Sequence, residues 1–312
     1  MKIVQIGIDL GNSMLKAATY KKGEEITAKL PNRIRFDKNV NPKARVMTID
    51  DKTIYLGIGE LNNNVLKHTR TNLLEQVLVM INELYPEETN LKVDLKIGLP
   101  PEQLFNDIFL KEYQAKFPIG KDIEFTINNV AKKVNINSVD VKAEGYSGFV
   151  HIVDDIDEKQ DILSIDVGGG TIDLCNYIYD YEDEMYYPDV THTIEKGIIP
   201  FGEEIAKLFN NTHGADIDQR QIDNILKNKL ETIEYKGDNY KLEDYLKALN
   251  PIVDSAINEI TNKYGTLDKY IVIGLGGGYD TFHRMIKDLI SKEIKLDSET
   301  QFYANALGYL EQ

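Results

Sequence analysis

The hydrophobic pattern in the first half of the chain changes from strand-like to helix-like. Residues 3–10 form an apolar run that predicts a strand, and residues 14–20 predict a second strand after a turn. Between residues 71 and 84, apolar side chains recur at every third or fourth position, which predicts an amphipathic helix. Further elements are predicted as a strand at 92–99, a helix at 101–116 and alternating short strands at 122–142.

The second half also combines apolar strands with helices. An apolar strand is predicted at 162–167, followed by a hairpin from Ile172 to about Glu195 with a tyrosine-rich, acidic tip. Gly202 is expected to precede a helix that ends near Asn210. Later elements are predicted as helices at about 216–230, 242–263, 281–291 and 300–312, with a strand at 270–274.

A short motif occurs in both halves of the chain. Residues 8–13, Ile-Asp-Leu-Gly-Asn-Ser, are matched 157 residues later by 165–170, Ile-Asp-Val-Gly-Gly-Gly, and the offset continues to Tyr20 and Tyr177. Both copies have an apolar strand, an aspartate, a glycine turn and a second strand. This predicts two similar domains, 1–150 and 151–297. Separately, the C-terminal helix 298–312 is expected to pack back on the first domain. A chain of 312 residues is also long enough to form two domains, each with its own hydrophobic core.

An Asp-x-Gly turn between two strands has a specific chemical use. Glycine permits backbone angles at which successive N–H groups converge into a site for an anion. An aspartate there repels phosphate but can hold a hydrated Mg²⁺ that binds phosphate. Either hairpin alone could be a structural glycine turn. The pair, at Asp9 and Asp166, predicts that two domains clamp one Mg-nucleotide.

A third glycine-rich segment, 274–280, lies between a predicted strand and a predicted helix. Its backbone could press against a flat ring or a ribose. The alternative is a dinucleotide-binding turn, which needs G-x-G-x-x-G. Gly274 and Gly276 fit that pattern, but Tyr279 occupies the third glycine position. The sequence also has no G-x-x-x-x-G-K-[S/T] motif of the P-loop type.

These segments resemble the motifs of the actin, sugar-kinase and heat-shock-chaperone superfamily. Residues 9–16 resemble the first phosphate motif, residues 166–173 the second, and residues 274–280 the adenosine motif. The resemblance implies an α/β, actin-like fold. Two similar domains, with ribonuclease-H-like sheets flanked by helices, would lie around a nucleotide cleft.

Within this superfamily the chain is most similar to the ParM-type plasmid-segregation actins. The Asp-x-Gly-Asn form of the first motif, the connecting segment 141–144 and the closing segment 302–308 carry this similarity. Residues 21–90 and 211–250 match no recognisable motif.

The resemblance implies a set of site residues for ATP, or GTP, with Mg²⁺. Lys16 would neutralise the β- and γ-phosphates, Asp9 and Asp166 would hold Mg²⁺ through water, and Glu144 would orient the attacking water. Asp166 and Glu144 are thus the expected catalytic residues. The expected nucleotide-binding residues are Asp9, Gly11, Asn12, Ser13, Lys16, Gly168, Gly169, Gly170, Thr171, Gly202, Glu203, Gly276, Gly277, Gly278 and Tyr279.

Some of these residues have plainer interpretations. Lys16 could be a solvent-facing strand lysine, and an acid before a glycine turn, such as Glu144, is common. Gly202 and Glu203 resemble a nucleotide contact in the chaperones, but a helix N-terminus also favours an acidic residue.

Composition narrows the possible partners and the compartment. With 36 basic and 51 acidic residues, the net charge is −15, whereas a direct grip on DNA needs a basic surface. A net negative charge of this size can also serve only to keep the protein soluble. A single cysteine, Cys175, suits a reducing cytoplasm, and the sequence shows no signal peptide and no apolar run long enough to span a membrane.

The expected function is an ATPase that polymerises into filaments and segregates plasmid DNA through a ParR-type DNA-binding adaptor. It is expected to contact neither nucleic acid nor membrane directly. The chaperone alternative needs a substrate domain for which these 312 residues leave no room. A soluble sugar or acyl kinase is the second interpretation, although no sugar-binding acid is evident. A third is an ATP-dependent regulator that does not polymerise.

Overall fold

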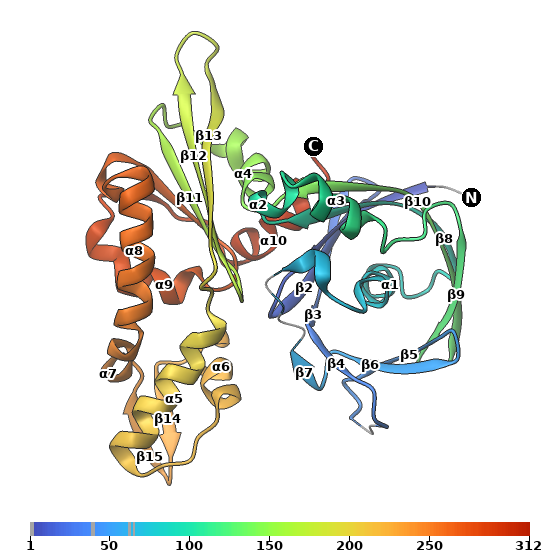
Figure 1. Ribbon diagram of the computed structural model, residues 1–312, viewed down its shortest axis with the longest axis horizontal. Helices are drawn as coiled ribbons and strands as arrows, with labels where there is room; N and C mark the ends of the chain where they lie inside the picture. The colour runs from blue at the N-terminus through green and yellow to red at the C-terminus, as the bar shows by residue number, and fades with distance from the viewer. Residues whose placement is uncertain (1–2, 39–40, 62–63, 65) are drawn as a thin grey trace. The chain divides into compact units, whose positions relative to one another are not determined.

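The computed structural model describes the whole chain apart from residues 1–2, 39–40, 62–63 and 65. The chain divides into two units (Figure 1). The N-terminal unit comprises residues 1–158 and 297–312, and the C-terminal unit comprises residues 159–296. Each unit has its own β-sheet, flanking helices and hydrophobic core.

The N-terminal unit is built on a mixed sheet with the strand order β3-β2-β1-β8-β10-β9-β5-β6-β4-β7. The sheet curves around α1 (Leu73–Leu84), whose apolar side chains complete the core (Figure 1). The strands are β1 (Ile3–Leu10), β2 (Met14–Lys21), β3 (Glu24–Pro31), β4 (Arg33–Arg35), β5 (Arg45–Ile49), β6 (Lys52–Leu56), β7 (Glu60–Leu61), β8 (Asn90–Leu99), β9 (Asp122–Ile127) and β10 (Val130–Ala143).

Helices and short 3₁₀ turns connect these strands. The 3₁₀ turn η1 (Lys67–Thr69) precedes α1. The helix expected at 101–116 is two helices, because the chain turns at Phe105 and Asn106 caps the second one. The short strands expected at 122–142 are a hairpin whose second strand, β10, is 14 residues long. The remaining elements are α2 (Pro101–Leu104), α3 (Asp107–Gln114), α4 (Tyr146–Ile152), η2 (Val153–Asp155) and α10 (Ser298–Gly308).

The C-terminal unit has a smaller sheet with the order β13-β12-β11-β16-β17 and a separate two-stranded ribbon, β14-β15. Gly202 lies within the first turn of α5 and not before the helix as expected, because α5 begins at Ile199. The elements are β11 (Ile162–Val167), β12 (Ile172–Asp180), β13 (Met185–Ile194), α5 (Ile199–His213), α6 (Gln219–Lys227), β14 (Thr232–Tyr235), β15 (Asp238–Lys241), α7 (Glu243–Leu246), η3 (Lys247–Leu249), α8 (Asn250–Tyr264), η4 (Leu267–Lys269), β16 (Ile271–Leu275), α9 (Tyr279–Ile286), η5 (Lys287–Leu289) and β17 (Lys292–Ile294).

The sequence repeat is also a structural repeat. In the N-terminal unit β1 pairs antiparallel with β2 and parallel with β8, and in the C-terminal unit β11 pairs antiparallel with β12 and parallel with β16. Asp9 lies opposite Lys16 across its hairpin, and Asp166 lies opposite Asp173 across the other. The two aspartates therefore occupy equivalent positions in two equivalent hairpins.

The C-terminal helix α10 packs on the N-terminal unit through glycines. A Cβ atom at Gly7 of β1 would lie 2.0 Å from the carbonyl oxygen of Ala306. A Cβ atom at Gly308 would lie 1.7 Å from the carbonyl oxygen of Ser147 in α4. Because no side-chain atom fits at these positions, α10 lies directly against the backbones of β1 and α4.

We expect Gly7→Ala to lower the free energy of unfolding by about 3 kcal/mol, because the methyl group must push α10 away from β1. Urea denaturation of the variant checks this. Gly120→Ala is the matched control: its φ is +75° but no atom lies within 4 Å of the added Cβ. Its expected cost, about 1 kcal/mol, comes from the backbone angle alone. Equal stability of the two variants would contradict the close packing of α10.

Candidate functional site

The first hairpin carries a buried ion pair. Register places Lys16 of β2 opposite Asp9 at the end of β1, and Lys16 Nζ donates to Asp9 Oδ2 at 2.8 Å. Both residues are buried. The plain interpretation of Lys16 as a solvent-facing strand lysine is therefore wrong.

A second buried lysine, which the sequence analysis missed, joins this pair to Glu144. Lys67 of η1 donates to Glu144 Oε1, and its Nζ lies 3.7 Å from Asp9 Oδ1. All three side chains are buried. Glu144 reaches this position because it follows β10 directly and its N–H donates to the carbonyl of Leu99, at the end of neighbouring β8. No local pattern marked Lys67, since it lies in a segment without a recognisable motif.

Arg70 stabilises the first hairpin turn through hydrogen bonds of its buried guanidinium. Its guanidinium donates to the carbonyl oxygens of Leu10 and Asn64, each at 2.6 Å, and to the side chain of Asn12. Burial lowers the pKa of Arg70 to about 10, although the neighbouring acidic groups Tyr113, Glu144 and Asp9 oppose this shift. Arg70 is therefore still a cation at neutral pH.

These cations set the ionisation of Asp9. Burial by itself raises the pKa of the Asp9 carboxyl, but the charges of Lys16, Lys67 and Arg70 outweigh burial and lower the pKa below its ordinary value. Because the pKa is depressed in the folded state, this group stabilises the fold above the ordinary carboxyl pKa. The contribution is lost as the pH falls through the lowered pKa.

The carbonyl groups of the first turn are anchored, which directs its N–H groups. Asn32 donates its side-chain amide to the carbonyl of Gly11 at 2.6 Å and its backbone N–H to the carbonyl of Ser13 at 2.9 Å. In a planar trans peptide the C=O and the following N–H point in opposite directions. The N–H of Asn12 therefore points away from the Asn32 side chain, as an anion-binding turn requires.

The second hairpin has the same arrangement, made by a different segment. The carbonyls of Gly168, Gly169 and Gly170 accept hydrogen bonds of 2.9–3.1 Å from the backbone N–H groups of residues 197–199. By the same peptide geometry, the N–H groups of Gly169, Gly170 and Thr171 point to the opposite side. The hairpin turn thus presents three N–H groups in succession.

Polar side chains fix the base of the second hairpin. Thr171 Oγ1 and Thr193 Oγ1 donate to the two oxygens of Asp173, at 2.9 and 2.7 Å. Asp166 is buried at the end of β11. Asp173 thus has a structural role, whereas Asp166 lies opposite it on β11, two residues before the glycine turn.

The third glycine segment meets the second hairpin. A Cβ atom at Gly276, whose φ is +77°, would lie 2.3 Å from Asp166 Oδ1, and the N–H of Gly278 donates to the carbonyl of Val167 at 2.9 Å. Gly277 is exposed beside them. Tyr279 does not present its ring to this turn: the ring packs against Gly274, and its hydroxyl donates to Glu293 at 2.8 Å.

The remaining expected nucleotide contact, Gly202 with Glu203, has a packing explanation. A Cβ atom at Gly202 would lie 2.1 Å from the Asp223 carboxylate of α6, so glycine allows α5 and α6 to approach. Glu203 is exposed but lies beyond the first turn of α5, which holds no acidic residue, so the helix dipole does not explain it.

The second hairpin also fits a magnesium-bound phosphate. Among the residues that the structure describes, no group of three or more His, Cys, Asp and Glu side chains is arranged to hold a metal ion. Mg²⁺ does not need such a group, because it usually binds one or two carboxylates and retains several waters. Asp166 supplies one carboxylate beside the backbone of Gly276, and the turn that follows it presents three N–H groups. Asp9 could serve only while sharing its carboxylate with Lys16 and Lys67.

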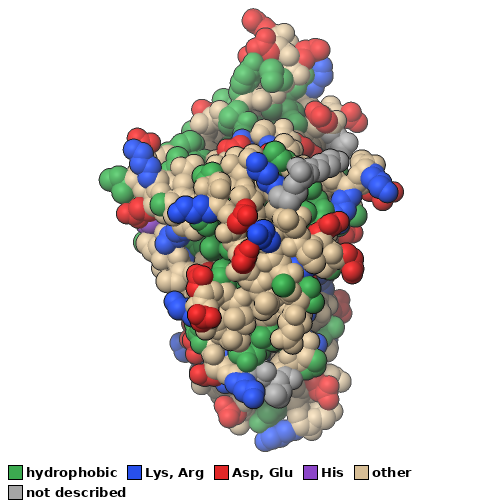
Figure 2. Space-filling view, turned by 90° about the vertical axis from the view of Figure 1, so that its right-hand side faces the viewer, with side chains coloured by type: hydrophobic (Ala, Val, Ile, Leu, Met, Phe, Trp, Pro, Cys, Tyr) green, Lys and Arg blue, Asp and Glu red, His purple; other side chains and the backbone are tan. Residues whose placement is uncertain are grey.

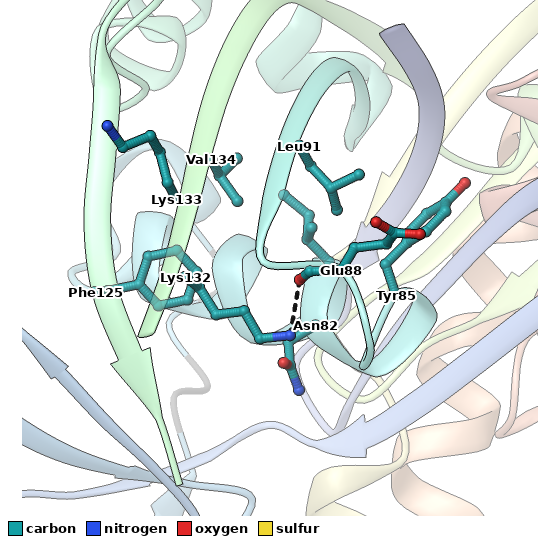
Figure 3. Close-up of a pocket in the computed structure, with 9 residues that line it drawn as sticks. Asn82, Tyr85, Glu88, Leu91, Phe125, Lys132, Lys133 and Val134 are labelled. Carbon is teal, nitrogen blue, oxygen red and sulfur yellow. Dashed lines mark hydrogen bonds between the residues drawn. The ribbon is translucent and has the colours of Figure 1, made fainter. Parts of the chain in front are cut away.

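A small pocket elsewhere in the N-terminal unit has no part in these clusters. Figure 3 shows it between α1, β9 and β10, with Lys132 reaching across. Lys132 Nζ donates to the carbonyls of Pro86 and Glu88 at 2.5 and 2.8 Å. This lysine therefore ties β10 to the loop after α1.

Comparisons with known proteins identify the fold. The family model described as "Archaeal actin homologue MreB-like, C-terminal" matches residues 164–288. A comparison with curated protein sequences gave no match. The archaeal actin homolog Ta0583 is similar over 99% of this chain and 98% of its own, with 17% identity and a TM-score of 0.79. A ParM from a 15-stranded filament of Clostridium botulinum covers 100% and 99%, with 19% identity and a TM-score of 0.74.

A third similar structure is Bacillus thuringiensis ParM with AMPPNP, which covers 100% of this chain and 98% of its own, at 14% identity and a TM-score of 0.64. At these identities the similarity establishes the fold. The chain has the actin-like fold, and the predicted fold class and the resemblance to ParM-type actins are confirmed at that level. No described helix is both long and apolar enough to cross a membrane.

We expect Lys67→Met to lower the free energy of unfolding by about 3–5 kcal/mol, because Glu144 would be left buried without its cation. The double variant Lys67→Met/Glu144→Gln removes both charges and should recover much of this loss. Thermal and urea unfolding measure both. Lys133→Met is the control, since Lys133 pairs with Glu124 and Asp122 at the surface and should matter little. A double variant no more stable than Lys67→Met would contradict the pairing.

Proposed function

We propose that this chain binds Mg-ATP through both hairpins, hydrolyses it, and polymerises in its ATP-bound form as a ParM-type actin. The observation that carries the proposal is the buried cluster of Asp9, Lys16, Lys67 and Glu144 beside a glycine turn whose carbonyl is anchored by Asn32. Similar structures bound to nucleotides support it: the Ta0583 complex with ADP and the ParM with AMPPNP.

Each part of the cluster has a task in phosphoryl transfer, which depends mainly on positioning and electrostatics. The N–H groups of the two turns would cradle the phosphates, and Lys16 would neutralise their charge. Glu144 would orient the attacking water, with Lys67 keeping its carboxylate in place. Asp166 would hold Mg²⁺ through water, and the ion would supply charge neutralisation on the β- and γ-phosphates.

Self-assembly and an adaptor complete the proposal. The similar structures include a ParM filament, and an interface that does not close into a ring produces a helical polymer.

Contact with DNA would run through a basic, ParR-type adaptor, because the chain carries a net charge of −15. On the face shown in Figure 2, Lys and Arg side chains are interspersed with Asp and Glu. We propose a cytoplasmic location, where Cys175 stays reduced.

We expect Glu144→Gln to bind Mg-ATP with nearly wild-type affinity and to hydrolyse it ~10²–10⁴-fold more slowly, because an amide orients water poorly. Isothermal titration with Mg-ATP and a phosphate-release assay measure the two effects. Glu124→Gln, at an exposed glutamate of the same unit, should hydrolyse ATP at the wild-type rate. An undiminished rate in Glu144→Gln would remove Glu144 from the mechanism.

We expect the purified protein to pellet above a critical concentration with Mg-ATP, and ADP to raise that concentration. Sedimentation and electron microscopy check this, and Glu144→Gln polymers should persist longer because their nucleotide stays a triphosphate. Phosphate transfer to an added sugar or carboxylic acid, without pelleting, would favour a kinase instead. Tight, salt-sensitive binding of the chain to plain duplex DNA would contradict the need for an adaptor.

A further inference from the structure

Helix α4 begins at Tyr146, two residues after Glu144, and lacks a capping side chain of its own. Its N-cap residue is Gly145, which has a φ of 74° and no side chain to accept a hydrogen bond. The first N–H groups of any helix have no partner within the helix, so a buried helix start needs an acceptor from elsewhere.

The acceptor comes from the C-terminal helix α10. Asn305 Oδ1 accepts hydrogen bonds from the N–H of Gly145 at 3.0 Å and from the N–H of Gly148 at 3.2 Å. The second is the bond that an N-cap side chain normally makes, and here it is supplied by a residue 157 positions away in sequence. Asn305 is itself buried, so it is fixed by packing.

Two further contacts hold Asn305 over this turn. Gly308 brings α10 against the backbone of Ser147, where a Cβ atom would lie 1.7 Å from the carbonyl oxygen. Gly98 of β8 lies between Tyr309 and Glu144: a Cβ atom there would be 1.9 Å from the Tyr309 hydroxyl and 2.9 Å from Glu144 Cγ. The segment 302–308 thus packs against the turn that follows Glu144, the residue expected to orient water.

We propose that Asn305 is a positioning residue for Glu144, acting through the Gly145 turn that it caps. The proposal rests on the proposed ATPase function. Glu144 is held on one side by Lys67 and followed on the other by a glycine turn that could adopt other angles. Asn305 removes that freedom. Its contribution should appear in turnover and not in nucleotide affinity, because the capped turn does not belong to either phosphate-binding hairpin.

The test compares Asn305→Ala with the wild type in steady-state ATP hydrolysis. We expect kcat to fall about tenfold, because small displacements of a positioned group have large effects on rate. The dissociation constant for Mg-ATP should stay within about twofold. Asn305→Asp keeps an acceptor oxygen in the same place, and a carboxylate suits a helix N-terminus, so it should restore kcat to within about threefold.

The same variants give a readout that does not depend on activity. In hydrogen–deuterium exchange, the amides of residues 145–148 should exchange faster in Asn305→Ala and be protected again in Asn305→Asp. Asn106→Ala is the matched control: Asn106 Oδ1 also accepts two helix N–H groups, from Ile108 and Phe109 of α3. It should lose comparable thermal stability but keep kcat and the exchange rates of 145–148.

A double variant separates positioning from general damage to the fold. If Asn305 acts through Glu144, Asn305→Ala should cause no further loss of kcat in a Glu144→Gln background. An equal further loss, or an unchanged kcat in Asn305→Ala alone, would overturn the positioning role. A wild-type protein that neither binds nor hydrolyses ATP would instead overturn the proposed function.

Discussion

The buried cluster of Asp9, Lys16, Lys67 and Glu144 is the constraint on which the N-terminal unit depends. Removing four charges from water is costly, and the cost is offset only while each charge keeps its partner at hydrogen-bonding distance. The cluster joins β1, β2, η1 and the end of β10, so none of these elements can shift without separating a pair. The proposed phosphoryl transfer would need such rigidity, and the charges whose burial is costly would act on a bound phosphate.

Both hairpins hold the carbonyls of their turn with hydrogen bonds, but they do so with different anchors. In the N-terminal unit, Asn32 makes both bonds: its side-chain amide donates to the carbonyl of Gly11 and its backbone N–H donates to the carbonyl of Ser13. In the C-terminal unit the backbone of residues 197–199 does this for three consecutive carbonyls. The shared requirement is that the carbonyls be occupied on one side, because planar peptides then present their N–H groups on the other. The two hairpins therefore share the same strand-turn-strand structure although different residues bind the carbonyls of their turns.

The C-terminal helix has a second task besides closing the core. Glycines at positions 7 and 308 let α10 touch the backbones of β1 and α4, and this contact delivers Asn305 to the turn after Glu144. The helix is thus both a packing element and a cap for another helix. Such a contact explains why a polar residue lies in the buried face of a helix whose neighbours are Ala304 and Ala306.

The sequence by itself predicted the strands β1, β2, β8 and β11, the amphipathic helix α1 and the repeated Asp-x-Gly hairpins, because hydrophobic period and glycine turns are local properties. It also singled out Asp9, Lys16, Glu144 and Asp166 as candidate site residues. Only the tertiary structure brought Lys67 to Glu144, Arg70 to the back of the turn and Asn305 to α4, since each contact joins segments at least 58 residues apart. The structure also showed that the ring of Tyr279 and the missing side chain of Gly202 serve packing. Burial and long-range pairing arise from the arrangement of strands and helices, which no local pattern encodes.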